Sequence, residues 1–267
     1  NVFIAFKLKN NIAMSQLALL TWITNNVVKP RKVRLMKNSA KKIRPNQILQ
    51  IGNDFGRSFT SFVPQDDKHN ASMSALEYIV MIKLLNLIEP SKVFEFGTYM
   101  GNTTRFILEN IVDFSDEPKL IYTLDLDSTD DVEFEGNDAT LASKVVGTKR
   151  LYQKSIHKNR VVQLLGDSLT FDFSSINSKF QFILIDANHA LEYVKKDTEN
   201  AYELLDYSSS YVIIWDDYEN PNFSDLTIYV DELASSGKNI YHVEETNWAI
   251  QLSDDLVVPA CIVGVSL

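Results

Sequence analysis

The stretch FEFGTYMGNTT, residues 94–104, sets two glycines four residues apart, with a carboxylate two residues before the first glycine. The apolar run KVFEFG (92–97) leads into it and predicts a buried strand, while NTTRFILENIVDF (102–114) predicts a helix. Because glycine has no Cβ, the loop between them can approach a ligand closely, and the free N–H groups of a helix start suit an anion. A purely structural tight turn explains the glycine pair equally well.

The same alternation of strand and helix repeats along the chain. The further strands are expected at residues 120–127, 160–167, 180–188 and 211–218, and the helices at 72–90, 139–156, 191–205 and 223–236. Residues 239–247, 248–253 and 260–267 are β-rich with little helix between them, which predicts an antiparallel edge. The fold class is therefore α/β: a doubly wound, mostly parallel seven-stranded sheet with an antiparallel C-terminal edge, of Rossmann-like form.

Composition is that of an ordinary globular protein, with 267 residues, 45% hydrophobic and 23% charged. One cysteine excludes an internal disulfide, and the four histidines show no zinc-finger spacing with it. We therefore expect a reducing, cytoplasmic location. Because the chain does not begin with methionine, a processed product and a piece of a longer protein both stay open.

Charge is distributed unevenly. The first 50 residues carry ten Lys/Arg and no Asp or Glu, so the net charge of -9 leaves 16 minus 35, or -19, for the rest. No nucleic-acid partner is expected for so acidic a body. The basic stretch 29–45 is interpreted as a solvated arm, and contact with an acidic partner stays open. Residues 12–28 are too often interrupted by polar side chains to span a membrane and predict a short amphipathic helix.

Two regions follow from these patterns. Residues 1–70 are expected to form an N-terminal helical and basic extension, and residues 71–267 the main domain. Residues 55–74 have few apolar anchors, so they are interpreted either as a lid over the ligand or as a plain surface connection.

Acidic residues at two further strand ends add to the glycine loop. Asp125 ends the strand at 120–127, where doubly wound sheets place an acid that binds a ribose, and Asp167 with Ser168 ends the strand at 160–167. The spacing Glu95-x-Gly97-x-x-x-Gly101 is neither the dinucleotide fingerprint nor the phosphate loop of nucleotide triphosphatases. With these three motifs in order, the chain resembles the class I S-adenosylmethionine-dependent methyltransferases.

That resemblance implies S-adenosylmethionine as cofactor. It implies that the loop lines the methionine end, Asp125 the ribose, and Asp167 with Ser168 the adenine edge. Asp127 is a rival for the ribose role, and a helix cap or a solvated strand end is the alternative for each acid. The implied cofactor-binding residues are Glu95, Gly97, Thr98, Tyr99, Gly101, Asn102, Thr103, Asp125, Asp167, Ser168 and Asp186.

The last two parallel strands end in LIDANHALEYVKKD and VIIWDDYENP, so Asp186, His189, Asp216 and Asp217 should emerge side by side if these strands are neighbours. Crowded carboxylates are costly unless a proton or cation neutralises them, and Mg²⁺ prefers such oxygen ligands. Asp-x-x-His followed by an acidic pair resembles the metal-dependent O-methyltransferases that act on sugar hydroxyls.

This second resemblance implies Asp186, Asp216 and Asp217 as ligands of Mg²⁺ or another divalent cation, and His189 as the catalytic base. Catechol-type relatives have a lysine at the position of the histidine, so a catechol acceptor is less well supported. His189 as a helix cap and Asp217 as a turn residue remain the structural alternatives.

The function expected from the sequence is a Mg²⁺-dependent O-methyltransferase that acts on a hydroxyl of a saccharide or other small molecule. A metal-independent methyltransferase and a non-catalytic module of a larger assembly are the alternatives. Trp215, Tyr218 and Trp248 are interpreted as core residues more readily than as walls of the acceptor pocket. Self-association into a homo-oligomer stays open.

Overall fold

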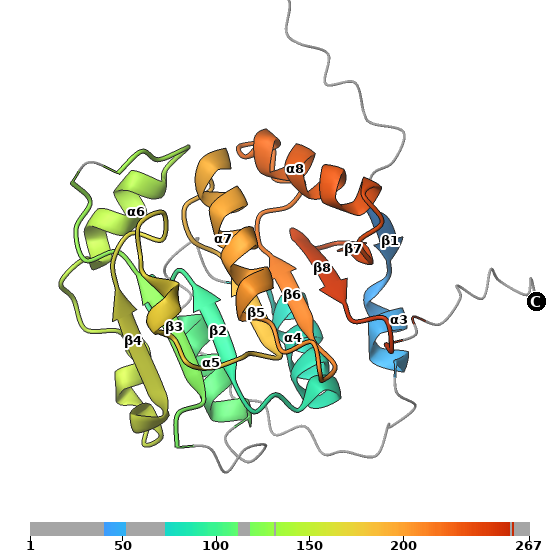
Figure 1. Ribbon diagram of the computed structural model, residues 1–267, viewed down its shortest axis with the longest axis horizontal. Helices are drawn as coiled ribbons and strands as arrows, with labels where there is room; N and C mark the ends of the chain where they lie inside the picture. Colours follow the sequence, from blue (N-terminus) through green and yellow to red (C-terminus); the bar gives the residue numbers. More distant parts are fainter. Residues whose placement is uncertain (1–39, 52–72, 112–117, 131, 257, 259–267) are drawn as a thin grey trace, which may run out of the picture. The chain divides into compact units, whose positions relative to one another are not determined.

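The computed structural model describes residues 40–51, 73–111, 118–130, 132–256 and 258. These residues form one mixed sheet with helices on both faces (Figure 1). The strands are β1 (Lys41–Ile43), β2 (Val93–Phe96), β3 (Ile121–Asp125), β4 (Val161–Leu165), β5 (Phe182–Ile185), β6 (Val212–Trp215), β7 (Ile240–Val243) and β8 (Trp248–Leu252). The helices are α3 (Pro45–Gln50), α4 (Ala75–Ile88), α5 (Asn102–Ile111), α6 (Asp138–Val145), α7 (Leu191–Leu204) and α8 (Ser224–Ser235).

The strand order within the described residues is β1-β7-β8-β6-β5-β2-β3-β4. Strands β4, β3, β2, β5 and β6 are parallel, and β8 pairs antiparallel with both β6 and β7. The predicted mostly parallel sheet with an antiparallel C-terminal part is therefore confirmed. Within the described ranges the sheet has eight strands instead of seven, because Lys41–Ile43 of the predicted N-terminal extension pair with β7 as an edge strand.

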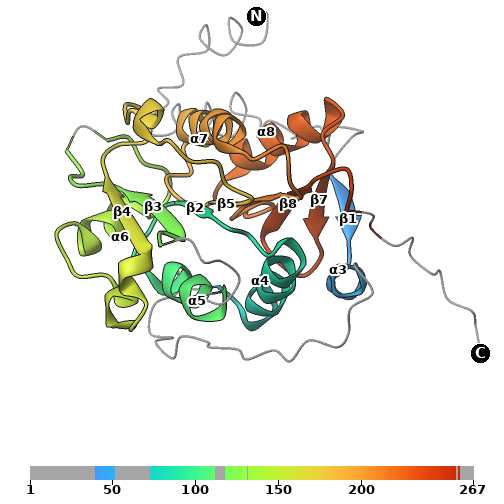
Figure 2. The same cartoon turned by 60° about the horizontal axis from the view of Figure 1, so that its bottom comes forward.

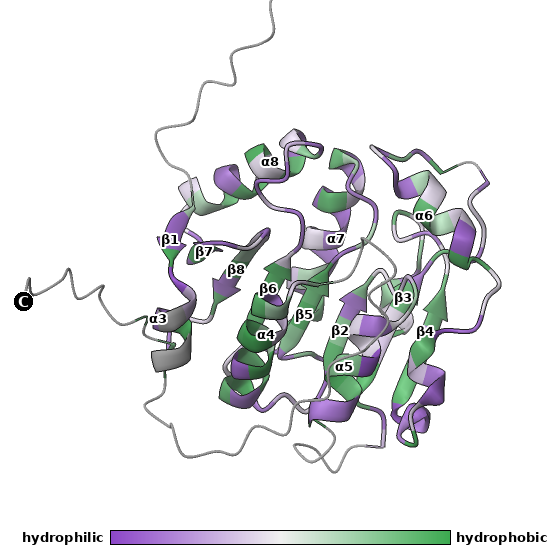
Figure 3. Ribbon diagram, turned by 180° about the vertical axis from the view of Figure 1, so that it is seen from behind, coloured by the Kyte–Doolittle hydropathy of each residue, from purple (hydrophilic) through white to green (hydrophobic). Residues whose placement is uncertain are grey.

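Two apolar layers cover the sheet. Figure 2 shows α3, α4 and α5 on one face and α7 and α8 on the other. Successive residues of β2 point to opposite layers: Val93 packs with the α4 and α5 side, whereas Phe94 and Phe96 pack with the α7 and α8 side. All four residues of β2, β5 and β6 are buried, as expected of central strands covered on both faces. Strands β5 and β6 and most of α4 have the hydrophobic colour in Figure 3.

Helix α4, Ala75–Ile88, lies within the helix predicted over residues 72–90 and begins after the N-cap Ser74. Ser74 and Glu77 form a reciprocal capping box, in which the Ser74 N–H donates to Glu77 Oε2 at 2.6 Å and the Glu77 N–H donates to Ser74 Oγ at 3.3 Å. The helix ends at Ile88, two residues before Pro90, since proline cannot continue it.

The single helix predicted over residues 139–156 is wrong. Helix α6 ends at Val145, and Gly147 has a φ of 71°, a left-handed conformation that stops a helix. The chain then turns back, and the Leu151 N–H donates to the Met100 carbonyl at 2.8 Å before a short 3₁₀ helix at Leu151–Lys154. The segment after α6 is thereby docked on the glycine loop.

Several predicted segments lie outside the described residues. They are the amphipathic helix at 12–28, most of the basic stretch at 29–45, most of the possible lid at 55–74 and the β-rich piece at 260–267. No helix of the described ranges has the length and apolar character needed to cross a membrane.

Candidate active site

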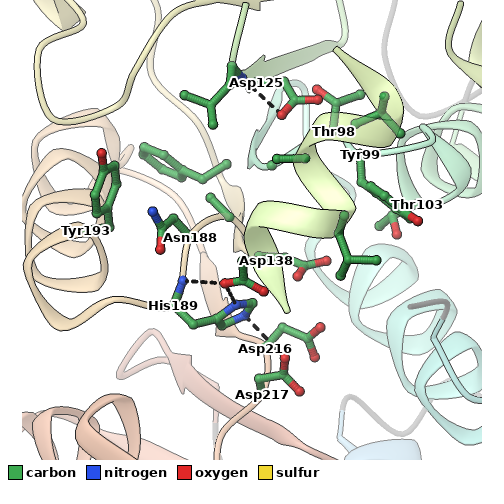
Figure 4. Close-up of a pocket in the computed structure, with 18 of the residues that line it drawn as sticks. Thr98, Tyr99, Thr103, Asp125, Asp138, Asn188, His189, Tyr193, Asp216 and Asp217 are labelled. Atoms are coloured by element: carbon green, nitrogen blue, oxygen red, sulfur yellow. Dashed lines mark hydrogen bonds and ion pairs between the residues drawn. The ribbon is translucent and has the colours of Figure 1, made fainter. Parts of the chain in front are cut away.

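A cavity of about 390 Å³ opens at the carboxyl ends of β2, β3, β5 and β6, a size typical of ligand pockets. The glycine loop after β2, the inner face of α6 and the turns after β5 and β6 all contribute to its lining. Parallel strands bring their carboxyl ends to one edge of the sheet, which explains why residues far apart in sequence meet here. Figure 4 shows the polar side chains that point into this space.

The glycine loop forms one wall. A Cβ on Gly97, which has a φ of 87°, would lie 1.9 Å from the carbonyl oxygen of Asp186, so only glycine lets the turns after β2 and β5 touch. Tyr99 also has a positive φ, 46°, a strained conformation that is concentrated at functional sites. Of the predicted loop residues, the cavity is lined by Gly97, Thr98, Tyr99, Asn102 and Thr103.

Gly101 instead allows the chain after α6 to pack on the loop. Its added Cβ would lie 3.0 Å from Arg150 Cβ and 3.1 Å from Tyr152 Cδ1, and it is not among the lining residues. The second glycine of the motif thus serves a close approach between two segments of protein.

Glu95 lies behind the loop, fully buried, and does not line the cavity. Its Oε2 accepts hydrogen bonds from the hydroxyls of Thr104 at 2.5 Å and Thr123 at 2.6 Å, and Thr123 Oγ1 lies 2.6 Å from Thr98 Oγ1. Burial raises the pKa of Glu95 to about 7, although both threonine bonds act to lower it. In this arrangement Glu95 anchors the loop to α5 and β3.

Asp125 lines the cavity, whereas its rival Asp127 is exposed and lies outside the lining. One Asp125 oxygen accepts the Leu126 N–H at 3.0 Å, and the other pairs with Arg150 Nη2 at 2.7 Å. Burial raises the pKa of Asp125, and the Arg150 charge opposes the shift. Arg150 also donates to the Val145 carbonyl, so it connects the end of α6 to the predicted ribose-binding acid.

Only one of the two residues predicted to bind the adenine edge lines the cavity. Ser168 lines the cavity, but Asp167 does not. The Asp167 carboxylate accepts the Leu169 N–H at 2.9 Å and the Tyr193 hydroxyl at 3.2 Å. Asp167 therefore fixes the turn after β4 and orients Tyr193, which does line the cavity.

His189 lies at the opposite end of the cavity, in the turn between β5 and α7. Its ring stacks on Phe223 with a centroid separation of 4.2 Å, and its Nδ1 lies 2.8 Å from Asp138 Oδ2. Its Nε2 lies 3.3 Å from Asp217 Oδ2. Burial lowers the pKa of His189, but the hydrogen bond to Asp138 and the nearby carboxylates outweigh burial and leave the pKa above its ordinary value.

Asp186, Asp216 and Asp217 all line the same cavity, as their positions after neighbouring strands β5 and β6 predicted. Burial raises the pKa of Asp186 well above its ordinary value, and the Asp216 and Asp217 charges raise it further. Burial likewise raises the pKa of Asp216 to about 7, even though Trp248 Nε1 donates to its Oδ1 at 2.7 Å. This crowding favours a bound proton or cation.

Asp217 is oriented differently from the other two. It has a φ of 58°, its Oδ1 accepts from Asn220 Nδ2 at 2.7 Å, and its Oδ2 faces His189. In the described part of the chain, no three His, Cys, Asp or Glu side chains are arranged to hold a metal ion. The three carboxylates are of the chemical type that a hard cation prefers and line one cavity, but their present orientation does not form a metal site, and Asp217 instead contacts Asn220 and His189.

Trp215, Tyr218 and Trp248 are core residues. Their side chains are at most 1% exposed, and none lines the cavity. Trp215 Nε1 donates to Thr198 Oγ1 at 2.9 Å, and the Tyr218 hydroxyl donates to Asp231 Oδ1 at 2.8 Å. Their structural interpretation is therefore confirmed.

Residues 94–218 match the family model described as a methyltransferase domain. The chain carries a methyltransferase domain. The match confirms the prediction, made from the glycine loop and the two strand-end acids, that the chain resembles the class I S-adenosylmethionine-dependent methyltransferases. The predicted enzyme class, an S-adenosylmethionine-dependent methyltransferase, is confirmed with it. A comparison with curated proteins finds no match.

The fold is shared with a solved methyltransferase structure. The calicheamicin methyltransferase CalS11 is 15% identical, with a TM-score of 0.51 over 67% of this chain and 79% of CalS11. PaMTH1 of Podospora anserina, bound to S-adenosylhomocysteine, is 18% identical, with a TM-score of 0.43 over 68% of this chain and 79% of its own. TomG of Streptomyces achromogenes, in complex with S-adenosylmethionine, is 16% identical, with a TM-score of 0.44 over 71% of this chain and 82% of its own.

The sequence interpretation missed Asp138, Asn188 and Phe223, which surround His189 in the cavity. Asn188 Oδ1 accepts the Ala190 N–H at 3.0 Å and so shapes the turn that carries the histidine. In the sequence, Asp138 has only the signal of an acidic residue at a helix start, which ordinary helices share. Nothing local connects it to a residue 51 positions later.

Proposed function

We propose that this methyltransferase transfers the methyl group of S-adenosylmethionine to a hydroxyl oxygen of a small molecule, with a saccharide as the favoured class. The observation that carries the proposal is His189 Nε2, a buried ring nitrogen with no hydrogen-bond partner among the described residues. It belongs to the same cavity as the glycine loop and Asp125. This shared lining supports a proton acceptor close to the predicted cofactor site.

The residues at the glycine-loop end of the cavity, opposite His189, fit S-adenosylmethionine. The loop at 97–103 and the start of α5 offer backbone close to a ligand, and Asp125 offers a carboxylate oriented by Arg150. The cofactor would supply a methyl carbon already activated by a positive sulfur. Asp125 would bind the ribose and Ser168 would contact the adenine edge, while Glu95 holds the loop from behind.

At the acceptor end, His189 Nε2 would take the hydroxyl proton as the acceptor oxygen bonds to the methyl carbon; the carbon–sulfur bond would break and its electron pair would stay on sulfur. A neighbouring carboxylate raises the pKa of the imidazole, which makes it a stronger proton acceptor. Alignment of donor carbon and acceptor oxygen provides much of the remaining rate.

A saccharide suits this end because amide side chains gather there. Asn188, Asn220 and Asn222 line the cavity, and an amide both donates to and accepts from hydroxyl groups. The Asn188 amide also bonds to Glu133 and Ala190, and the Asn220 amide to Asp217 and Asn222, so a sugar hydroxyl would share or replace these bonds. Sugar hydroxyls need this mixture of partners. The wall offered by the described residues is therefore suited to a neutral polyol.

We further propose that Asp186, Asp216 and Asp217 hold a divalent cation such as Mg²⁺. Support comes from the raised pKa of the first two carboxyls, whose mutual repulsion a cation would relieve. A bound cation would lower the pKa of the acceptor hydroxyl. Methyl transfer without a metal is the second candidate, favoured by the hydrogen bond of Asp217 Oδ1 with Asn220 and by the position of Asp217 Oδ2, which lies 3.3 Å from His189 Nε2.

One experiment separates these candidates. The purified chain is incubated with isotopically labelled S-adenosylmethionine and a panel of saccharides and phenols, with and without EDTA, and with Mg²⁺ restored. The metal-dependent form predicts turnover that EDTA abolishes and Mg²⁺ restores, whereas turnover that survives EDTA selects the metal-free form. His189→Ala should lower kcat about 10²- to 10⁴-fold.

His242→Ala is the matched control, because His242 is also buried but lies outside the cavity, with Nε2 3.0 Å from the Thr246 carbonyl. It should retain kcat, and calorimetry should give both variants nearly the wild-type affinity for S-adenosylhomocysteine. A His189→Ala variant with full activity would refute the proton-acceptor role. The cytoplasmic location, self-association and acidic partner of the basic arm stay predictions from the sequence.

A further inference from the structure

The surroundings of His189 point to a residue that neither the sequence motifs nor the comparisons assign. Asp138 Oδ2 lies 2.8 Å from His189 Nδ1 and also accepts the His189 backbone N–H at 3.1 Å. Both side chains are about 9% exposed. Figure 4 shows Asp138 at the start of α6, pointing at the imidazole. One oxygen of the Asp138 carboxylate therefore bonds to both the ring and the backbone of His189.

This contact decides which ring nitrogen carries the proton. An ionised carboxylate can only accept, so Nδ1 must be the donor and the neutral ring then has its lone pair on Nε2. Nε2 faces Asp217 and makes no hydrogen bond within the described residues. The lone pair is thus directed away from Asp138, to the side where the proposed function needs a proton acceptor.

Asp138 is not needed to cap α6. It follows the N-cap residue Asn137, whose side chain makes no capping bond, and the two hydrogen bonds of the Asp138 side chain to described residues both go to His189. The stack on Phe223 fixes the ring plane, and Asp138 fixes the rotation within that plane. Together these contacts leave the imidazole one orientation.

We propose that Asp138 is a positioning residue: it holds His189 in the tautomer and orientation that leave Nε2 free to take the acceptor proton. The inference rests on the proposed function. It also connects the two ends of the cavity, because Leu141, Ala142 and Val145 of the same helix line it beside the loop residues predicted to hold the cofactor. Helix α6 therefore contributes both to the cofactor wall and to the orientation of the base.

The test is Asp138→Asn, which preserves size but can donate to Nδ1 and so permit the opposite tautomer. We expect kcat to fall by about 10²-fold or more, with the KM for the acceptor within about twofold and unchanged affinity for S-adenosylhomocysteine. Asp138→Glu, which restores a carboxylate on a longer side chain, should recover at least about tenfold of the lost kcat. If Asp138 had only a structural role, its substitution would lower stability and would change kcat and the KM for the acceptor together.

Asp225→Asn is the matched control, since Asp225 also lies in the first turn of a helix, α8, but is exposed and outside the cavity. It should keep wild-type kcat. An Asp138→Asn variant that equals wild type, or a folded Asp138→Glu variant no better than Asp138→Asn, overturns the proposal.

A second readout does not depend on activity. Nitrogen-15 NMR of the imidazole distinguishes a protonated Nδ1 from a protonated Nε2, and wild-type His189, when neutral, should carry its proton on Nδ1. In Asp138→Asn the Nε2-protonated form should become populated, and identical nitrogen shifts in the two proteins overturn the proposal. Absence of methyl transfer by the wild type would refute the proposed function, while the NMR result would still decide whether Asp138 sets the tautomer.

Discussion

Gly97→Ala tests the contact that brings the two ends of the cavity together. The added Cβ would lie 1.9 Å from the Asp186 carbonyl oxygen, 2.6 Å from its carbonyl carbon and 2.9 Å from Ala187 Cα. All three are backbone atoms of the turn after β5, so no flexible side chain can move aside to make room. The turns after β2 and β5 must separate, and this displaces Asp186 from the loop that is predicted to hold the cofactor.

The magnitude has two parts. A left-handed φ costs a residue with a Cβ about 1–2 kcal/mol, and overpacking of a tight site typically costs about 1–3 kcal/mol more. We therefore expect Gly97→Ala to lower the free energy of unfolding by about 2–5 kcal/mol, a large share of the about 5–15 kcal/mol of an ordinary domain. Gly147→Ala measures the cost of the left-handed φ alone, because Gly147 has a φ of 71° with nothing within 4 Å of its added Cβ.

Urea denaturation of the wild type and both variants measures these differences, and calorimetry with S-adenosylhomocysteine measures the site. Gly147→Ala should lose about 1–2 kcal/mol of stability and keep its affinity. Gly97→Ala should lose more stability and bind at least about tenfold more weakly, which corresponds to about 1.4 kcal/mol of binding free energy. Equal losses of stability in the two variants, or an unchanged affinity in Gly97→Ala, would refute the steric argument.

Two further predictions concern buried charges. Burial raises the pKa of Glu95 from 4.5 to about 7, so the folded chain keeps a proton that the unfolded chain loses between these values, and stability falls as the pH rises through this window. Relative to Glu95→Gln, the wild type should lose about 2–3 kcal/mol between pH 5 and pH 8 in urea denaturation, and a constant difference would contradict the buried-acid assignment. Arg150→Met leaves Asp125 without its cation and should cost about 3–5 kcal/mol, whereas adding Asp125→Asn should restore part of that loss. Strictly additive losses in this double-mutant cycle would show that the pair is not coupled.

Local pattern predicted much of the fold and part of the site. Buried parallel strands are apolar throughout, and glycine spacing marks a close approach of backbone, so the loop after β2 and the acids after β3, β5 and β6 were identified from the chain alone. Asp186 and Asp216 meet because parallel strands end at one edge of the sheet, a rule that needs no coordinates. The proposed roles of these acids come from the resemblance to methyltransferases and not from this rule.

Roles that depend on contacts between distant segments came only from the tertiary structure. Asp138 reaches His189 across 51 positions, and Arg150 reaches Asp125 across 25, because α6 ends at Val145 and the chain turns back onto the glycine loop. Glu95 and Gly101, which resemble ligand-binding residues in sequence, face other parts of the protein. Sequence periodicity reports which face of an element is buried, but it does not report which side chains meet there, since that depends on how the packed elements close on one another.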